Sequence, residues 1–296
     1  MGAGSLPALY WRRYSFIGPR SRVERAGEQA VIEGVKQIVA VASGKGGVGK
    51  STVTVNLALA MAARGKRVGL LDADIYGPSQ AQMLGIAPGT RPRMIDESTM
   101  APIEAHGIKA MSMAFMVDVE TAMVWRGPMV AGAFQQLLNQ TAWGELDYLF
   151  IDMPPGTGDI QLTLAQKVAV AGAVIVTTPQ DIALLDARKG IEMFRKVNVP
   201  VLGVVENMSL HVCSNCGHAE PIFGEGGGER VAALYQTEVI GRLPLKLSIR
   251  ERSDSGCPSV VAEPDGEVAG YFNAMAERVD QQLGTTVRKG PSIGFS

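Results

Sequence analysis

From about residue 35 onward, short apolar runs alternate with longer segments in which the apolar residues recur at helical spacing. The short runs are rich in β-branched residues and show no regular polar alternation, which indicates strands buried on both faces. The longer segments predict helices over residues 50–64, 181–197 and 265–283, the first of them ending at Gly65. We therefore expect an α/β fold with a mostly parallel sheet and helices on both of its faces. The predicted strands are QIVAVAS, KRVGLLD, LDYLFID, GAVIVTT and VPVLGVV.

This pattern defines one domain over residues 34–284, preceded by a basic extension over residues 1–33. The extension has no acidic residue before Glu24, and this charge bias fits either a mitochondrial presequence or a disordered basic tail. Its segment WRRYSF resembles a presequence processing site, so we favour an import signal and the mitochondrial matrix over the cytoplasm of a bacterium. Residues 285–296 are expected to form a loose tail. The arginines of the extension are Arg12, Arg13, Arg20 and Arg22.

Composition narrows the functional classes. The chain has 296 residues, of which 46% are hydrophobic, and this is sufficient for one sizeable core. A formal net charge of −1 argues against broad nucleic-acid binding, which normally leaves a basic footprint. Three cysteines are too few for a secreted disulfide framework and favour a reducing compartment. No apolar run reaches the roughly 20 residues needed to span a bilayer, so no membrane span is expected.

The segment SGKGGVGKST, residues 43–52, contains the phosphate-binding pattern G-x-x-x-x-G-K-[ST] between a predicted strand and a predicted helix. Glycines let successive backbone N–H groups surround phosphate oxygens, and the helix N-terminus adds partial positive charge. We expect Lys50 to contact the β- and γ-phosphates and the Ser51 hydroxyl to bind Mg²⁺. The alternative is a glycine-rich turn without a ligand. The residues predicted to contact the nucleotide here are Gly44, Lys45, Gly46, Gly47, Val48, Gly49, Lys50, Ser51 and Thr52.

Carboxylates follow two of the predicted strands. Asp152 ends the run LDYLFID, while Asp72 and Asp74 follow KRVGLL. Ligands of α/β proteins bind at the carboxyl ends of the strands, so we expect Asp74 and Asp152 to join Ser51 in a magnesium site. Of the two aspartates after the second strand, Asp74 lies further out and is the better candidate for orienting the attacking water. Each aspartate taken alone is also compatible with a helix cap or a loop position.

A second chemical site is suggested by HVCSNCGHAE, in which Cys213 and Cys216 form a C-x-x-C pair. Two closely spaced thiolates in a polar loop are suited to binding a metal. A redox dithiol is one alternative, and a zinc site that also uses His211 and His218 is another. Cys257 lies outside the pair and is interpreted as structural or incidental.

Together, the motifs KGGVGKS, DADIYGPS, DMPPGTGD, TTPQDIALLDARKG and VENMS make residues 34–283 similar to the Mrp/ApbC family of iron–sulfur cluster carrier ATPases. These are P-loop NTPases of the deviant Walker A, or SIMIBI, type. Their mitochondrial branch is associated with assembly of respiratory complex I. The nitrogenase iron protein and the MinD/ParA positioning ATPases share the same P-loop.

The resemblance implies a homodimer in which Lys45 reaches the nucleotide phosphates of the partner chain, acting with Lys50 and Asp74 in slow ATP hydrolysis. It implies that Asn207 contacts the adenine. It further implies that Cys213 and Cys216 of two chains hold one shared, labile [4Fe–4S] cluster, which passes from a donor scaffold to apo-protein recipients. ATP and Mg²⁺ binding would act as the switch for this transfer.

Two other functions remain open at this stage. A MinD/ParA-like positioning ATPase would assemble on membrane or DNA, but the last predicted helix is more acidic than basic, which disfavours an anionic membrane. The third reading is an ATPase switch with a structural zinc site.

Overall fold

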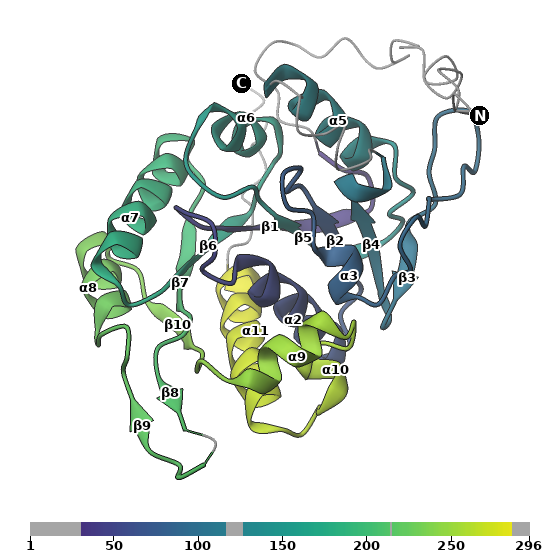
Figure 1. The fold of residues 1–296 in the computed structure, drawn as a ribbon. Helices are drawn as coiled ribbons and strands as arrows, with labels where there is room; N and C mark the ends of the chain where they lie inside the picture. Colours follow the sequence, from purple (N-terminus) through teal and green to yellow (C-terminus); the bar gives the residue numbers. More distant parts are fainter. Residues whose placement is uncertain (1–30, 117–126, 214, 286–296) are drawn as a thin grey trace, which may run out of the picture.

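The apolar runs of the sequence form the central strands of an eight-stranded sheet in the order β10-β7-β6-β1-β5-β2-β4-β3 (Figure 1). The computed structural model describes residues 31–116, 127–213 and 215–285, so most of the basic extension and the predicted tail lie outside it. Neighbouring strands are parallel except for β3, which is antiparallel to β4 at one edge. The strands are β1 (Val35–Ala42), β2 (Val68–Asp72), β3 (Ile103–Ala105), β4 (Ile108–Ser112), β5 (Leu146–Asp152), β6 (Gly172–Thr177), β7 (Val201–Glu206) and β10 (Val239–Arg242).

Helices cover both faces of this sheet, as expected. On one face α2 and α11 pack on the strands, with α3, α9 and α10 beside them, and on the other lie α5, α6, α7 and α8 (Figure 1). Strand β1 serves both layers, because Val39 and Val41 enter the first core and Ile38 and Ala40 the second. The helices are α2 (Lys50–Ala63), α3 (Gln80–Met83), α5 (Gly127–Asn139), α6 (Asp159–Lys167), α7 (Asp181–Lys196), α8 (Gly227–Tyr235), α9 (Leu247–Asp254), α10 (Ser259–Ala262) and α11 (Glu267–Thr285), with a 3₁₀ turn at Met113–Phe115.

The three helices predicted from the sequence are confirmed within two residues at each end, as α2, α7 and α11. Gly65 follows the end of α2 with φ of 82°, the left-handed conformation expected of a residue that terminates a helix. Strand β5 has the predicted bounds, while β4, β10 and the helices α5, α6 and α8 were not predicted. None of the described helices is long and apolar enough to cross a membrane.

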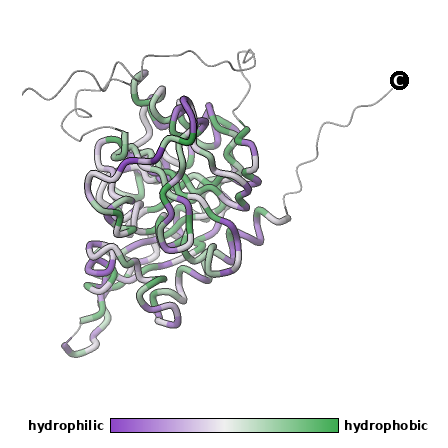
Figure 2. Tube along the Cα trace, turned by 90° about the vertical axis from the view of Figure 1, so that its right-hand side faces the viewer, coloured by the Kyte–Doolittle hydropathy of each residue, from purple (hydrophilic) through white to green (hydrophobic). Residues whose placement is uncertain are grey.

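A small hairpin, β8 (His211–Val212) with β9 (Ala219–Glu220), extends from the body of the domain (Figure 1). It carries the C-x-x-C pair at its tip. Figure 2 shows the same hairpin at the bottom of the molecule, where hydrophilic and hydrophobic residues alternate along it. The second chemical motif is therefore placed on a projection outside the two hydrophobic cores, with Cys216 exposed.

Asp147, near the start of β5, links the amino ends of β1, β2 and β5 through hydrogen bonds. Its carboxylate accepts hydrogen bonds from Lys36 Nζ at 2.8 Å and from the backbone N–H of Arg67 at 2.9 Å, with further bonds from the Arg67 guanidinium. The Arg67 hydrogen bonds, followed by that of Lys36, hold the pKa of Asp147 well below its usual range. A depressed folded-state pKa stabilises the protein above the unfolded pKa and loses this contribution as the pH falls.

We expect Asp147→Asn to lower the free energy of unfolding by about 1 kcal/mol at pH 7, since the site is partly exposed. The difference in free energy of unfolding between the variant and the wild type should shrink as the pH falls from about 5 to about 3. Protonation of Asp147 in the unfolded wild-type chain then offsets the stabilisation that the ionised carboxylate gives the folded state. Urea unfolding across this range measures the effect. Asp265→Asn is the control, because Asp265 has no ion pair among the described residues. A difference that stays constant with pH would contradict the assignment.

Candidate nucleotide site and cysteine hairpin

The loop between β1 and α2 has the backbone of a phosphate-binding turn. Gly47 and Gly49 adopt φ values of 80° and 83°, which residues with a side chain rarely adopt. A Cβ on Gly49 would lie 2.1 Å from Asn207 Nδ2, so close packing also requires glycine there. Because β1 leads directly into this loop and α2 begins at Lys50, the loop N–H groups and the positive end of the helix converge at one point.

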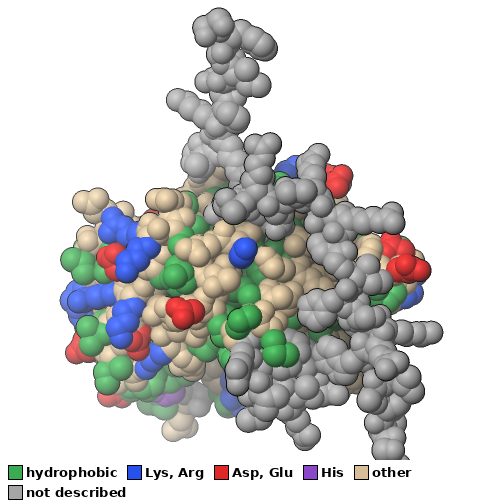
Figure 3. All heavy atoms as spheres, turned by 90° about the horizontal axis from the view of Figure 1, so that it is seen from above, with side chains coloured by type: hydrophobic (Ala, Val, Ile, Leu, Met, Phe, Trp, Pro, Cys, Tyr) green, Lys and Arg blue, Asp and Glu red, His purple; other side chains and the backbone are tan. Residues whose placement is uncertain are grey.

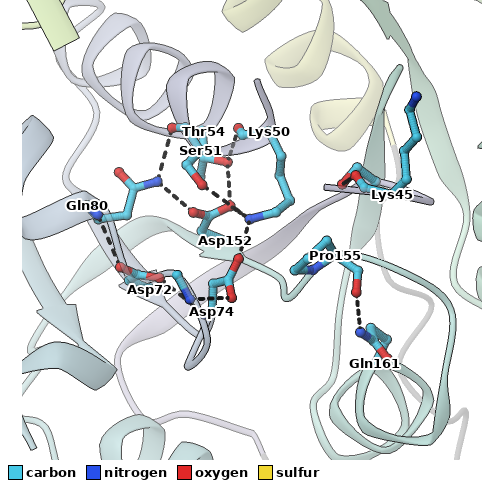
Figure 4. A network of polar contacts seen from close by, with 12 residues as sticks. Lys45, Lys50, Ser51, Thr54, Asp72, Asp74, Gln80, Asp152, Pro155 and Gln161 are labelled. Carbon is cyan, nitrogen blue, oxygen red and sulfur yellow. Dashed lines mark hydrogen bonds and ion pairs between the residues drawn. The ribbon is translucent and has the colours of Figure 1, made fainter. Parts of the chain in front are cut away.

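The side chain of Lys50 lies at the centre of a buried polar cluster (Figure 4). Its Nζ is 2.6 Å from Asp152 Oδ1, 3.6 Å from Asp74 Oδ2 and 3.2 Å from Ser51 Oγ. Lys50 is 6% exposed and Asp152 is fully buried. Burial lowers the pKa of Lys50, but the carboxylates of Asp152, Asp74 and Asp72 outweigh this effect, so that its pKa is raised and the ammonium is retained. The sheet has thus brought together four residues that the sequence predicted to meet.

The donor set of this cluster suits Mg²⁺. Ser51 contributes a hydroxyl, and Asp74 and Asp152 contribute carboxylates, which are the hard oxygen ligands that this ion prefers. These three side chains all lie within 3.6 Å of one cation, the Lys50 ammonium. A positive charge is therefore already favoured at this point.

Asp72 has a different role from that of Asp74. It is completely buried and accepts hydrogen bonds from the N–H groups of Asp74 and Gln80, both at 3.1 Å, and from Ser112 Oγ at 3.0 Å. Burial, together with the nearby charge of Asp152, raises the pKa of Asp72 to about 7. Burial also raises the pKa of Asp74, and the Lys50 ammonium partly offsets this. Asp72 therefore shapes the loop that presents Asp74.

Lys45, the additional lysine of the loop, does not join this cluster. Figure 4 shows its side chain directed away from Lys50 and Asp152. Its backbone is held by Ser43 Oγ, which donates to the Lys45 carbonyl at 2.8 Å. Within the described part of the chain the Lys45 ammonium makes no ion pair.

The preceding residue, Gly44, fits so tightly against helix α7 that a Cβ would lie 2.1 Å from the Asp186 backbone.

Asn207, which follows β7, lies against the phosphate loop. Its Nδ2 donates to the Val48 carbonyl at 2.8 Å, and its N–H donates to the Thr177 carbonyl at 2.8 Å. The structure therefore places Asn207 at the loop that was predicted to bind the nucleotide.

Three residues of the cluster were missed in the sequence. Thr54 is one helical turn after Lys50, and its Oγ1 donates to Asp152 Oδ1 at 3.2 Å, a position that helical spacing would have indicated. Gln80 donates from Nε2 to Asp152 Oδ2 at 2.8 Å, and Ser112 binds Asp72. Neither had a local signal, because both reach the cluster only through the packing of distant segments.

In the cysteine hairpin, the N–H of Cys213 donates to the His218 carbonyl at 2.9 Å, and that of Gly217 donates to the Cys213 carbonyl at 2.9 Å. Hydrogen bonds to the Cys213 sulfur from the N–H of Cys216 and then of Asn215 lower the pKa of the Cys213 thiol. Cys216 is exposed, and all three cysteines are free thiols. This loop favours a thiolate, which is the form that binds metals.

Among the described residues, the two cysteines and two histidines of the hairpin are not arranged as a zinc site within one chain. The His211 ring is held at the base of the hairpin, with Nδ1 3.3 Å from the Leu245 carbonyl oxygen. Across the described ranges, no group of three or more His, Cys, Asp or Glu side chains is arranged to hold a metal ion. A single chain therefore offers two thiolates at this hairpin.

Comparison with known proteins shows the family of the chain. Residues 34–280 match the ParA family, described as the NUBPL iron-transfer P-loop NTPase. The chain is 67% identical to the iron-sulfur cluster carrier protein of Pseudomonas fragi over 251 residues, covering 84% of this chain and 88% of the relative. It is 56% identical to the carrier protein of Escherichia coli, covering 93% and 74%, and 52% identical to the mouse iron-sulfur cluster transfer protein NUBPL, covering 86% and 80%.

Among solved structures, a nucleotide-binding protein from Archaeoglobus fulgidus in complex with ADP and containing cobalt superposes with a TM-score of 0.69 at 40% identity. The match covers 81% of this chain and 93% of that protein. The septum site-determining protein MinD from Pyrococcus horikoshii, complexed with Mg-ADP, gives a TM-score of 0.64 at 23% identity, covering 85% and 99%. At 23% identity, the similarity to MinD establishes a shared fold and nothing more.

Proposed function

The chain belongs to the ParA family of NUBPL iron-transfer P-loop NTPases, and on that premise we propose that it is an ATP-dependent carrier of a labile [4Fe–4S] cluster. Relatives at 52% to 67% identity carry the names of iron-sulfur cluster carrier or transfer proteins. The observation that carries the proposal is the hairpin, where Cys213 and Cys216 form a free, polar C-x-x-C loop on the same domain as the phosphate loop. The cluster is cargo, taken from a donor scaffold and delivered to apo-proteins.

In this proposal ATP binds at residues 44–52, and Asn207 contacts the adenine. Ser51, Asp74 and Asp152 hold Mg²⁺, which when bound neutralises charge on the phosphate oxygens. Lys50 exchanges its contact with Asp152 for the phosphates, and Asp74 orients the attacking water. A timing switch does not need rapid turnover, so we expect hydrolysis to be slow.

We further propose that the carrier is a homodimer. Four thiolates are needed for one such cluster, and each chain supplies two. Ile182 and Leu185, near the start of α7, are 70% and 55% exposed, and α7 packs directly on Gly44 of the phosphate loop. A second copy covering this face would bury both side chains and bring Lys45 toward the partner's nucleotide.

The surface charges do not suggest a nucleic-acid partner. On the α7 and α8 side of the face seen from above, basic, acidic and hydrophobic side chains are interspersed (Figure 3), unlike a uniformly basic nucleic-acid surface.

A continuous backbone ladder offers a route between the two sites. From Asn207 the chain runs directly toward the hairpin, and this segment pairs with residues 243–245. Leu243 donates to the Glu206 carbonyl at 3.0 Å, Ser209 to the Leu243 carbonyl at 2.9 Å and Leu245 to the Leu210 carbonyl at 2.8 Å. Movement of Asn207 with the nucleotide would thus reach Cys213 through hydrogen-bonded backbone, which is how we propose ATP controls cluster release.

The proposal is tested by anaerobic reconstitution of the wild-type chain with iron and sulfide. We expect about two irons per chain, visible charge-transfer absorption, and a dimer by light scattering. Transfer of the cluster to an apo-protein should then change with ATP and Mg²⁺. Stoichiometric zinc that iron does not displace, with no visible absorption, would instead support the ATPase switch with a structural metal.

The likeness to MinD does not favour a positioning ATPase, because at 23% identity it speaks only for the fold. The compartment stays a prediction, since relatives include bacterial carriers and a mitochondrial protein of Arabidopsis thaliana required for NADH dehydrogenase. Import assays with isolated mitochondria would distinguish the matrix from a bacterial cytoplasm.

A further inference from the structure

Gln80 is the first residue of α3, and its side chain is inserted into the polar cluster (Figure 4). It is 1% exposed. Its Nε2 donates to Asp152 Oδ2 at 2.8 Å and to the Ser51 carbonyl at 3.0 Å, while its backbone N–H donates to Asp72 Oδ2 at 3.1 Å. One residue therefore contacts two of the proposed magnesium ligands and the aspartate that shapes the intervening loop.

The orientation of the Gln80 amide is fixed by its partners. The Asp152 carboxylate and the Ser51 carbonyl only accept hydrogen bonds, so the amide nitrogen must face them. The amide oxygen then has no hydrogen-bond partner among the residues that the structure describes, although it is buried. An apolar side chain of similar size would avoid this unpaired oxygen, but it would leave Asp152 Oδ2 without its amide donor. The amide is therefore held in place by the bonds of its nitrogen to Asp152 and to the Ser51 carbonyl.

Gln80 contacts only one of the two carboxylate oxygens of Asp152. The Gln80 Nε2 donates a hydrogen bond to Asp152 Oδ2. The other oxygen, Oδ1, accepts hydrogen bonds from Lys50 Nζ at 2.6 Å and Thr54 Oγ1 at 3.2 Å. The carboxylate is thus prevented from rotating, and it presents one defined oxygen to the side where the Lys50 ammonium and Ser51 hydroxyl lie. Residues that fix a ligand in this way contribute strongly to metal affinity, typically about 10- to 100-fold.

We propose that Gln80 is a positioning residue for Mg²⁺, which holds Asp152 so that Oδ1 is presented to the ion. The inference rests on the proposed nucleotide function and deepens it. Through its backbone contact with Asp72, Gln80 also fixes the end of the loop that carries Asp74. Gln80 thereby holds Asp152, at the end of β5, in a fixed position relative to the loop after β2.

The test is the affinity of the full chain for a fluorescent ADP analogue, titrated with Mg²⁺ and compared with binding in EDTA. For Gln80→Leu we expect the Mg²⁺ concentration at half-maximal effect to rise about tenfold or more, with binding in EDTA unchanged within about twofold. Gln82→Leu, at an exposed position of the same helix, should behave as the wild type. Gln80→Met provides a second apolar variant if the leucine variant is unstable on thermal unfolding.

An unchanged Mg²⁺ requirement in a folded Gln80 variant would overturn the inference while leaving the proposed function intact. Equal weakening in Mg²⁺ and in EDTA would also overturn it, since the defect would then lie in the phosphate loop or the fold. A wild-type chain that binds no ADP under either condition would overturn the proposed function itself.

Discussion

Replacing Lys50 with methionine is expected to reduce ATP hydrolysis by about 10²- to 10³-fold and also to destabilise the free protein. The first effect follows from loss of the ammonium proposed to contact the phosphates. The second follows because Asp152 is fully buried, and its ion pair with Lys50 at 2.6 Å would be lost. Removing one partner of a buried pair costs about 3–5 kcal/mol. Single-turnover hydrolysis and urea unfolding measure the two effects.

Lys45→Met is the matched comparison. Its ammonium makes no ion pair in the described residues, so the stability of the free chain should stay near that of the wild type. Hydrolysis should still fall if Lys45 acts on the partner's nucleotide. Equal destabilisation by both variants would be inconsistent with the buried cluster, and normal ATP-dependent cluster transfer by Lys50→Met would refute the proposed switch.

Replacing Cys213 or Cys216 with serine should abolish cluster binding. Each substitution removes two of the four thiolates proposed for a shared cluster, because both chains of the dimer carry it. Cys216 is exposed and the hairpin lies outside the two cores, so the free variants should unfold at the wild-type temperature. Iron and sulfide content after reconstitution, with visible absorption, gives the measurement.

Cys257→Ser is the control for this experiment, since Cys257 follows α9 and lies apart from the hairpin in the chain. It should retain about two irons per chain. Wild-type iron content in Cys213→Ser would mean that the cargo is bound elsewhere. Loss of nucleotide binding in the same variant would indicate that the hairpin supports the fold of the ATP site.

Much of the site was predictable from local patterns. Glycine spacing, an adjoining strand and an adjoining helix predicted a strand–loop–helix unit, which β1 and α2 form, and the apolar run ending at Asp152 predicted a carboxylate at a strand end. The parallel arrangement then required Asp74 and Asp152 to approach Lys50, and the distances of 3.6 and 2.6 Å confirm this. The strands β4 and β10 were missed because runs of four or five residues do not establish a period.

The sequence alone was sufficient for the fold class and for placing the glycine-rich loop between a strand and a helix, because both depend on residue spacing within one strand or helical turn. Tertiary packing decided which groups complete the cluster. Gln80 and Asp152 are 72 positions apart, and their contact exists only because α3 packs against α2 and β4, which brings its first residue to the end of β5. Packing likewise holds the His211 ring against Leu245, so the close spacing of cysteines and histidines in the sequence does not produce a four-ligand site in the part of the chain that the structure describes. Such contacts are set by how distant surfaces fit together, for which the linear sequence gives no local signal.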